Sequence, residues 1–211
     1  MSTSAKAEST QRQRAEPVRV SVGIPQGLFG DPNSGQITGA VRRGGELVSL
    51  DESDYGLWNL FLTPASDATG MAEHLPGSGG DVDAIERLRK LGLLVEFERG
   101  AHPDGEIAHL RPIPLGVGLG KANGDSGGFE IQNTTLTLTS PVSLDAISIM
   151  FWWDMDGLND LEALVAQATA RLPGFPPAAL RIAAVEIVVR LMAERLLYLD
   201  APGARAGGEV S

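Results

Sequence analysis

The stretch from Leu144 to Asp200, with the serine that precedes it, reads SLDAISIMFWWDMDGLNDLEALVAQATARLPGFPPAALRIAAVEIVVRLMAERLLYLD. Apolar residues recur in it at three- and four-residue spacing, which is typical of helices that bury one face. Turn formers interrupt this pattern at Asp156-Gly157 and again in the proline-rich segment 173–177. We therefore predict three helices here, with a short strand at Leu196–Leu199 leaving the last one.

Polar and proline residues indicate where these helices begin. Ser143 or Asp145 can accept hydrogen bonds from the first turn of the first helix, and Asn159 or Asp160 can do so for the second. Proline suits a helix start because it lacks an amide hydrogen, so the segment 173–177 is expected to end the second helix and to lead into the third. The residues expected in the core of the whole chain are Trp58, Phe61, Ile85, Leu88, Ile147, Phe151, Leu164, Ile187 and Leu191.

Charge and composition exclude several classes of function. The 211 residues include 17 basic and 27 acidic ones, and the resulting net charge of −10 argues against nucleic acid as a partner. The chain has no cysteine, which excludes disulfides and zinc-thiolate sites and fits a reducing, cytoplasmic setting. No apolar run approaches the roughly 20 residues that span a bilayer, so no membrane partner is expected. Residues 1–17 and 202–211 are predicted to be disordered tails.

The first half carries a fainter version of the same pattern. Its expected elements are a strand at 18–24, a loop at 25–35, a hairpin turning at 42–45, a helix opened by Asp51 or Ser53, and a last helix from Asp81 or Asp83 to Gly92. The segments Leu93–Glu98 and Glu106–Pro112 flank an Asp104-Gly105 turn, which predicts a second hairpin. A glycine-rich loop is then expected at 116–128, followed by strands at 129–132 and 135–139.

Four features recur in the same order in both halves. Each half has a glycine-rich segment after a strand, then an alternating strand, a helix with tryptophan near its end, and a last helix that turns into a strand. Helix, helix, strand and hairpin is the order of a winged helix. We therefore predict an α+β fold of two winged-helix-like units, each with a small antiparallel sheet and three helices, arisen by internal duplication. The units are expected at 18–105 and 106–201, with Trp58 equivalent to Trp152 or Trp153.

The second half also contains, in this order, a strand, an aromatic helix end, an Asp-Gly pair and two apolar helical stretches. These segments are Thr135–Thr139, Phe151–Trp153, Asp156-Gly157, Leu161–Leu164 and Val188–Leu199. Together they resemble the PqqD-like proteins, which are also called RiPP recognition elements. The resemblance implies a small winged-helix fold that binds a leader peptide by strand addition and leaves catalysis to partner enzymes.

The partner predicted from these observations is a protein or peptide. Unpaired backbone groups at a sheet edge form a template for an added strand. Trp152 and Trp153 are adjacent and cannot both face one core, so one is expected to be exposed and to anchor a partner. The predicted binding residues are Trp152, Trp153, Thr135, Thr137 and Thr139. We expect a non-catalytic adaptor without a cofactor, because no nucleophile–base pair is recognisable.

The alternative function is a winged-helix transcription regulator. Its nucleic-acid contacts would be Arg87, Arg89 and Lys90 on the last helix of the first half. Carboxylates share that helix and surround the expected wing, which carries Glu96, Glu98, Asp104 and Glu106. Because phosphate contacts need net positive charge, the adaptor is the preferred hypothesis.

Three other clusters were weighed as chemical sites. Imidazole and carboxylate groups at His102, Asp104, Glu106 and His109 could bind a metal, but a polar loop is the preferred interpretation because His109 would point to the other face of a strand. The segment Gly116–Lys121 lacks the spacing of a phosphate-binding loop. The carboxylates of Asp154, Asp156, Asp160 and Glu162 are expected to cap helices and not to bind calcium. No metal site is therefore predicted.

Overall fold

The computed structural model describes residues 17–64, 82–98, 105–121, 128–133 and 140–202, which form a mixed α+β fold with small antiparallel sheets. The elements of the first half are β1 (Pro17–Ser21), β2 (Ile24–Gly30), β3 (Ile37–Arg43), β4 (Glu46–Asp51), α1 (Glu52–Leu60), α3 (Val82–Lys90) and β5 (Leu94–Glu98). Those of the second half are η1 (Glu106–His109, a 3-10 helix), β6 (Arg111–Pro114), β7 (Gly116–Lys121), β8 (Phe129–Asn133), β9 (Val142–Leu144), α4 (Ala146–Asp154), α5 (Leu161–Arg171), α6 (Pro177–Ala193) and β10 (Leu197–Asp200).

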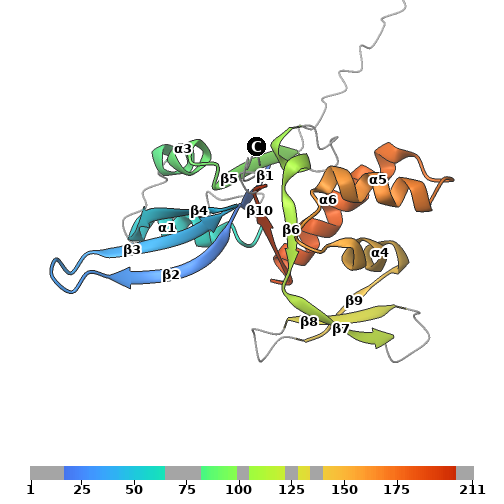
Figure 1. Ribbon diagram of the computed structural model, residues 1–211, viewed down its shortest axis with the longest axis horizontal. Coiled ribbons are helices and arrows are strands. Elements are labelled where there is room, and N and C mark those ends of the chain that lie inside the picture. Colours follow the sequence, from blue (N-terminus) through green and yellow to red (C-terminus); the bar gives the residue numbers. More distant parts are fainter. Residues whose placement is uncertain (1–16, 65–81, 99–104, 122–127, 134–139, 203–211) are drawn as a thin grey trace, which may run out of the picture.

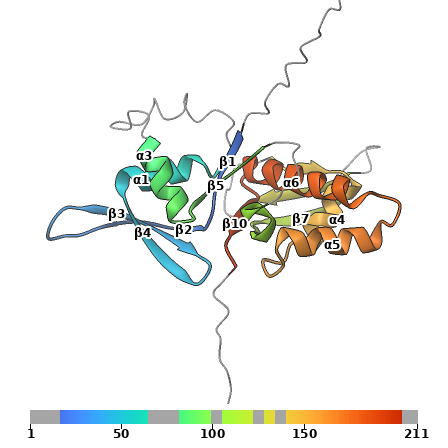
Figure 2. The same cartoon turned by 90° about the horizontal axis from the view of Figure 1, so that it is seen from above.

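The strands pair in the same way in both halves. The first strand of each half pairs antiparallel with the last, so that β1 joins β5 and β6 joins β10. The three strands between them form an antiparallel meander, β2-β3-β4 in one half and β7-β8-β9 in the other. The two meanders lie on opposite sides of the molecule, with β1, β5, β6 and β10 between them (Figures 1 and 2).

Both segments that were expected to be glycine-rich loops contain strands instead, namely β2 and β7. Each is hydrogen-bonded along a neighbouring strand, and this tertiary pairing overrides the local turn preference. Each also contains a shift of register, between Pro25 and Gly27 in β2 and between Gly118 and Gly120 in β7. Gly27 (φ +112°) and Gly120 (φ +101°) adopt angles that favour glycine, which explains turn-forming residues inside a strand.

The hairpin expected after Gly92 is wrong. The strand β5 pairs with β1, residues 106–109 form η1, and β6 pairs with β10. Pairing with β1 aligns β5 along five residue pairs and buries Val18 and Val20, a gain that a polar surface hairpin lacks. The expected turn residue Asp104 lies outside the described residues.

The helix ends follow the sequence closely. Asp51 caps α1 and Asp145 caps α4, each accepting a hydrogen bond from the backbone N–H three residues later, at 2.7 and 2.8 Å. Trp58 and Trp152 lie at the same place in these two nine-residue helices, and both side chains are buried. Asp160 caps α5, and α6 begins at Pro177, the last residue of the segment that was expected to lead into it.

Among the described residues, the buried apolar side chains form two clusters, and β5 contributes to both of them. Of the predicted core residues, all but two are buried, and Ile85 and Ile147 pack against the clusters from partly buried positions. The larger cluster contains α4, α5 and α6 of the second half together with Val18, Val20 and Val22 of the first. The halves are therefore packed against one another through β1.

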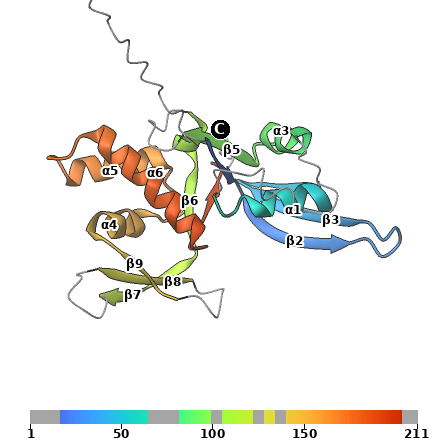
Figure 3. The ribbon, with the colours of Figure 1, turned by 180° about the vertical axis from the view of Figure 1, so that it is seen from behind.

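One buried carboxylate also joins the halves. Asp200, at the end of β10, accepts a hydrogen bond from the backbone N–H of Gly44 in the β3–β4 turn, at 2.7 Å. Its other oxygen lies 3.5 Å from Arg111, which also donates to the carbonyl of Ala201 at 2.6 Å. The view from behind shows β6 and β10 between the two groups of helices (Figure 3).

Candidate partner-binding surface

The outer edge of β7 is an exposed apolar strand edge. The strand lies at the border of its sheet, and within the described part of the chain no strand pairs with its outer side. Val117 and Leu119 are each 48% exposed. An open edge with apolar side chains is the surface on which an added strand gains both backbone hydrogen bonds and buried area.

Two aromatic rings lie beside this edge. Gly118 has no side chain, and the ring of Phe129 on β8 lies so close that a Cβ built on Gly118 would be 2.9 Å from it. Trp153, at the end of α4, meets Phe129 edge to face with ring centroids 5.7 Å apart. Trp153 is 66% exposed, so the aromatic pair presents apolar surface on the face of the sheet that carries Gly118 and Ile131, whereas Val117, which pairs with Gln132, lies on the opposite face. We call Val117, Leu119, Phe129 and Trp153 the β7 surface.

The two adjacent tryptophans divide as the sequence predicts. Trp152 is buried in the larger core cluster, whereas Trp153 is exposed. The predicted binding residues Thr135, Thr137 and Thr139 lie outside the described residues. The described partner of β8 on that side is β9, which is three residues long.

The free edge of β9 is less open than that of β7. Arg190 of α6 donates a hydrogen bond to the carbonyl of Ser143 at 2.8 Å. The adjacent hollow between α4 and α6 contains Ile147, Ile187 and Glu186, and Arg190 closes one side of it. A strand added here would have to displace this arginine, so we prefer the β7 edge as the candidate site.

The acidic cluster near the tryptophans serves local structure. Asp160 caps α5, and Asp156 accepts from the backbone N–H groups of Leu158 and Asn159. The N–H of Asn159, followed by that of Leu158, lowers the pKa of Asp156 below its ordinary value of 3.8. Asp154 pairs with Arg171, and Glu162 pairs with Arg181.

The residues of the DNA-binding alternative are not a free basic patch. Arg87 forms two hydrogen bonds with the buried carboxylate of Asp54, at 2.7 and 3.0 Å. Lys90 lies 4.0 Å from Glu86 on the same helix. Arg89 is exposed, one position beyond the buried Leu88.

The His and carboxylate residues that were considered as metal ligands lie only partly within the described residues. His102 and Asp104 lie outside the described residues, Glu106 begins η1, and His109 lies 3.8 Å from Asp160. Among the residues that the structure does describe, no three His, Asp or Glu side chains are grouped as metal ligands would be.

The sequence did not reveal the main part of the β7 surface. Val117, Leu119 and Phe129 flank glycines that predict a loop, and only the pairing of β7 with β8 makes them part of a sheet edge. Comparison with known proteins finds no matching family model, no matching curated protein and no matching solved structure. In the described ranges, no helix has both the length and the apolar character to cross a membrane.

Proposed function

We propose that this chain is a non-catalytic adaptor that binds an extended peptide segment of a partner protein along β7. The observation that carries the proposal is the open β7 edge, which has exposed apolar side chains at Val117 and Leu119 and the Phe129–Trp153 pair on the face of the sheet opposite Val117. Hydrogen bonds to the strand backbone would give affinity, and the aromatic pair would anchor side chains on one face of the added strand.

The partner segment has a defined chemistry under this proposal. Side chains alternate across a strand, so apolar residues are expected at every second position of the segment. The chain carries a net charge of −10, and complementary charge accelerates association, so the segment is expected to be basic. This chemistry agrees with the adaptor role implied by the resemblance to PqqD-like proteins.

We also infer that the halves are duplicated winged-helix-like units. Four shared features support this: the strand pairing, the glycine bulge in the first meander strand, the aspartate cap and the tryptophan two positions before the helix end. The strand that would begin a wing, β5, is used in the central ribbon instead. Because β5 is paired in the central ribbon, the described residues contain no wing hairpin that could contact the DNA backbone. This supports the adaptor over the regulator.

The experiment is a selection of random twelve-residue peptides on the full-length chain, followed by binding measurements. Selected peptides should be basic with alternating apolar residues, and they should slow amide exchange in β7. Val117→Lys places a charge on the edge and should weaken binding about tenfold or more, as should Trp153→Ala.

A matched control distinguishes binding at this surface from non-specific binding to exposed apolar residues. Leu158→Lys also replaces an exposed aliphatic residue with lysine, at a position that is 77% exposed in the turn between α4 and α5, and it should leave binding unchanged. Peptides that bind Val117→Lys as well as the unmodified chain, or that protect amides elsewhere, would contradict the proposal.

A further inference from the structure

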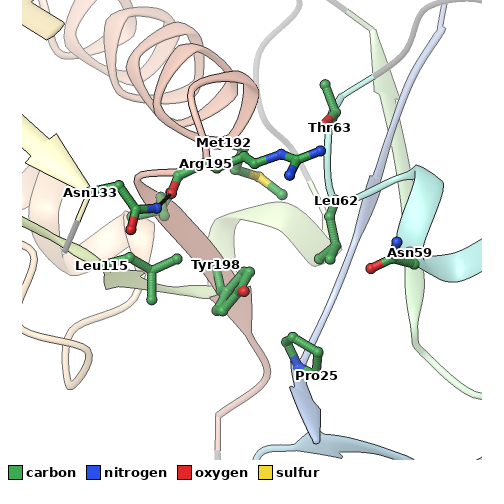
Figure 4. Close-up of a pocket in the computed structure, with 10 residues that line it drawn as sticks. Pro25, Asn59, Leu62, Thr63, Leu115, Asn133, Met192, Arg195 and Tyr198 are labelled. Carbon is green, nitrogen blue, oxygen red and sulfur yellow. Dashed lines mark hydrogen bonds between the residues drawn. The ribbon is translucent and has the colours of Figure 1, made fainter. Parts of the chain in front are cut away.

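A pocket of about 160 Å³ lies where the two halves meet. Its apolar lining includes Leu62 after α1, Leu115 before β7 and Met192 near the end of α6. Its polar lining includes Thr63, Arg195 and the half-buried Tyr198. In Figure 4 the guanidinium of Arg195 extends across the pocket toward the side formed by Leu62 and Thr63.

Arg195 holds an unfavourable backbone conformation to reach this place. Its φ is +55°, and it is the one residue other than glycine with positive φ in the described part of the chain. The equivalent position after α3 is Gly92 (φ +65°), since each residue precedes a leucine whose N–H bonds back to the helix, Leu93 to Leu88 and Leu196 to Leu191. A side chain in this region costs about 1 kcal/mol or more relative to glycine, and such strain concentrates at functional positions.

The charge of Arg195 also lacks a partner among the described residues. Five other arginines, at positions 19, 87, 111, 171 and 181, pair with carboxylates. No hydrogen bond or ion pair of the Arg195 guanidinium occurs within the described ranges, and none of the described residues that line the pocket carries a carboxylate. In a chain of net charge −10, the described lining of this pocket therefore combines a cation with no acidic group.

The remaining polar groups favour a ligand that accepts hydrogen bonds. Burial raises the pKa of Tyr198 above its ordinary value of 10.0, so its hydroxyl is protonated and can donate at neutral pH. Thr63 and Asn59 add a hydroxyl and an amide to the lining. The planar fork of an arginine matches the two oxygens of a carboxylate.

We propose that this pocket binds a small organic monocarboxylate. A cavity of roughly 150 Å³ holds a benzene ring, so the volume fits a ring of this size with its carboxylate at Arg195. The C-terminal ends of α1 and α6 both lie at the pocket, and their negative dipole ends offset part of the arginine charge. This electrostatic balance favours one negative charge over the two of a phosphate.

The test is an NMR titration of the full-length chain with sodium benzoate. The backbone amides of Thr63, Leu115 and Tyr198 should shift and saturate. Acetate should bind more weakly because it leaves the apolar wall of the pocket uncovered. Benzamide, which has the shape of benzoate without its charge, and inorganic phosphate should produce no saturating shift at these amides.

Arg195→Gly tests the residue itself, and it retains the fold because glycine accepts this φ without strain. It should weaken benzoate binding about tenfold or more, since a charge-assisted hydrogen bond is lost. Arg89→Ala removes the same charge from α3, outside the pocket, and should leave the affinity unchanged. Equal affinity in Arg195→Gly, binding of benzamide as tight as that of benzoate, tighter binding of phosphate, or no saturating shift with benzoate would each overturn the proposal.

Discussion

Gly92 and Arg195 occupy equivalent positions, and the backbone carbonyl of each accepts a hydrogen bond from the last residue of a nearby strand. Arg43, the last residue of β3, donates its Nε hydrogen to the carbonyl of Gly92 at 3.0 Å. Asn133, the last residue of β8, donates its amide hydrogen to the carbonyl of Arg195. A Cβ built on Gly92 would lie 2.6 Å from the Arg43 guanidinium. The Arg43 side chain can therefore occupy this position only because residue 92 is glycine.

This close approach predicts an energetic coupling between Gly92 and Arg43. Gly92→Ala should destabilise the fold by about 1–2 kcal/mol, because it strains the backbone and crowds the Arg43 guanidinium. In an Arg43→Asn background the crowding is removed, and the cost of Gly92→Ala should fall by about 0.5 kcal/mol or more. Urea unfolding of the two single variants and the double variant measures the coupling. Strict additivity would contradict it.

Asp145 predicts a pH-dependent contribution to stability. The N–H of Ser148 lowers the pKa of the Asp145 carboxyl below its ordinary value of 3.8. Because the folded pKa is the lower one, this stabilisation is present above 3.8 and is lost as the pH falls through the folded value. Asp145→Ala should therefore cost about 1 kcal/mol at pH 7 and less at pH values below the folded pKa. Urea unfolding across that range measures the difference, and a pH-independent cost would contradict the assignment.

Among the elements, the helices could be predicted from sequence and most of the sheet pairing could not. Helix ends depend on neighbouring residues, so Asp145, Asp160 and Pro177 could be recognised as helix starts. Strand pairing depends on distant residues. The partner of β5 is β1, more than seventy positions away, and no local pattern reveals it.

Of the candidate surface, the exposed tryptophan could be predicted from the sequence and the strand edge beside it could not. Two adjacent tryptophans cannot share one core, so the exposure of one of them followed from the sequence. Which strand edge lies beside Trp153 depends on the fold of a glycine-rich segment whose composition favours a loop. The strained backbone of Arg195 has no local sequence signal, and only its equivalence to Gly92 in the other half marks the position as one that favours glycine.

The helix α4 carries a buried aromatic residue and, two positions later, the exposed one that we propose as a binding residue. Phe151 is fully buried, so Phe151→Ala should cost about 3–5 kcal/mol through lost transfer energy and a cavity. Trp153 is mostly exposed two positions later, and Trp153→Ala should change stability by about 0.5 kcal/mol or less. Chemical denaturation of both variants tests the contrast, and a large loss in Trp153→Ala would disqualify it as a probe of binding alone.

At the scale of the molecule, the shared core and Asp200 predict that both halves unfold together. Tryptophan fluorescence, which reports on Trp58 and on the pair in α4, should change in a single transition that coincides with the loss of circular dichroism. Asp200→Ala removes the acceptor for Gly44 and the carboxylate beside Arg111, and it should cost about 3 kcal/mol. Two separate transitions in the unmodified chain would show that the halves are independent domains.

Charge across the whole molecule predicts no binding to duplex DNA. A regulator of this type would place α3 in a groove, yet Arg87 is engaged by Asp54 and Lys90 lies near Glu86. The net charge is −10 and the described residues of α3 form no free basic face, so little is gained from released counterions and lowering the salt should not strengthen binding. Gel-shift titrations at physiological and low salt measure this. The double variant Arg89→Ala/Lys90→Ala leaves the Arg87–Asp54 pair intact. Complexes that strengthen steeply as the salt concentration falls and are lost in this variant would contradict the adaptor hypothesis and favour the transcription regulator.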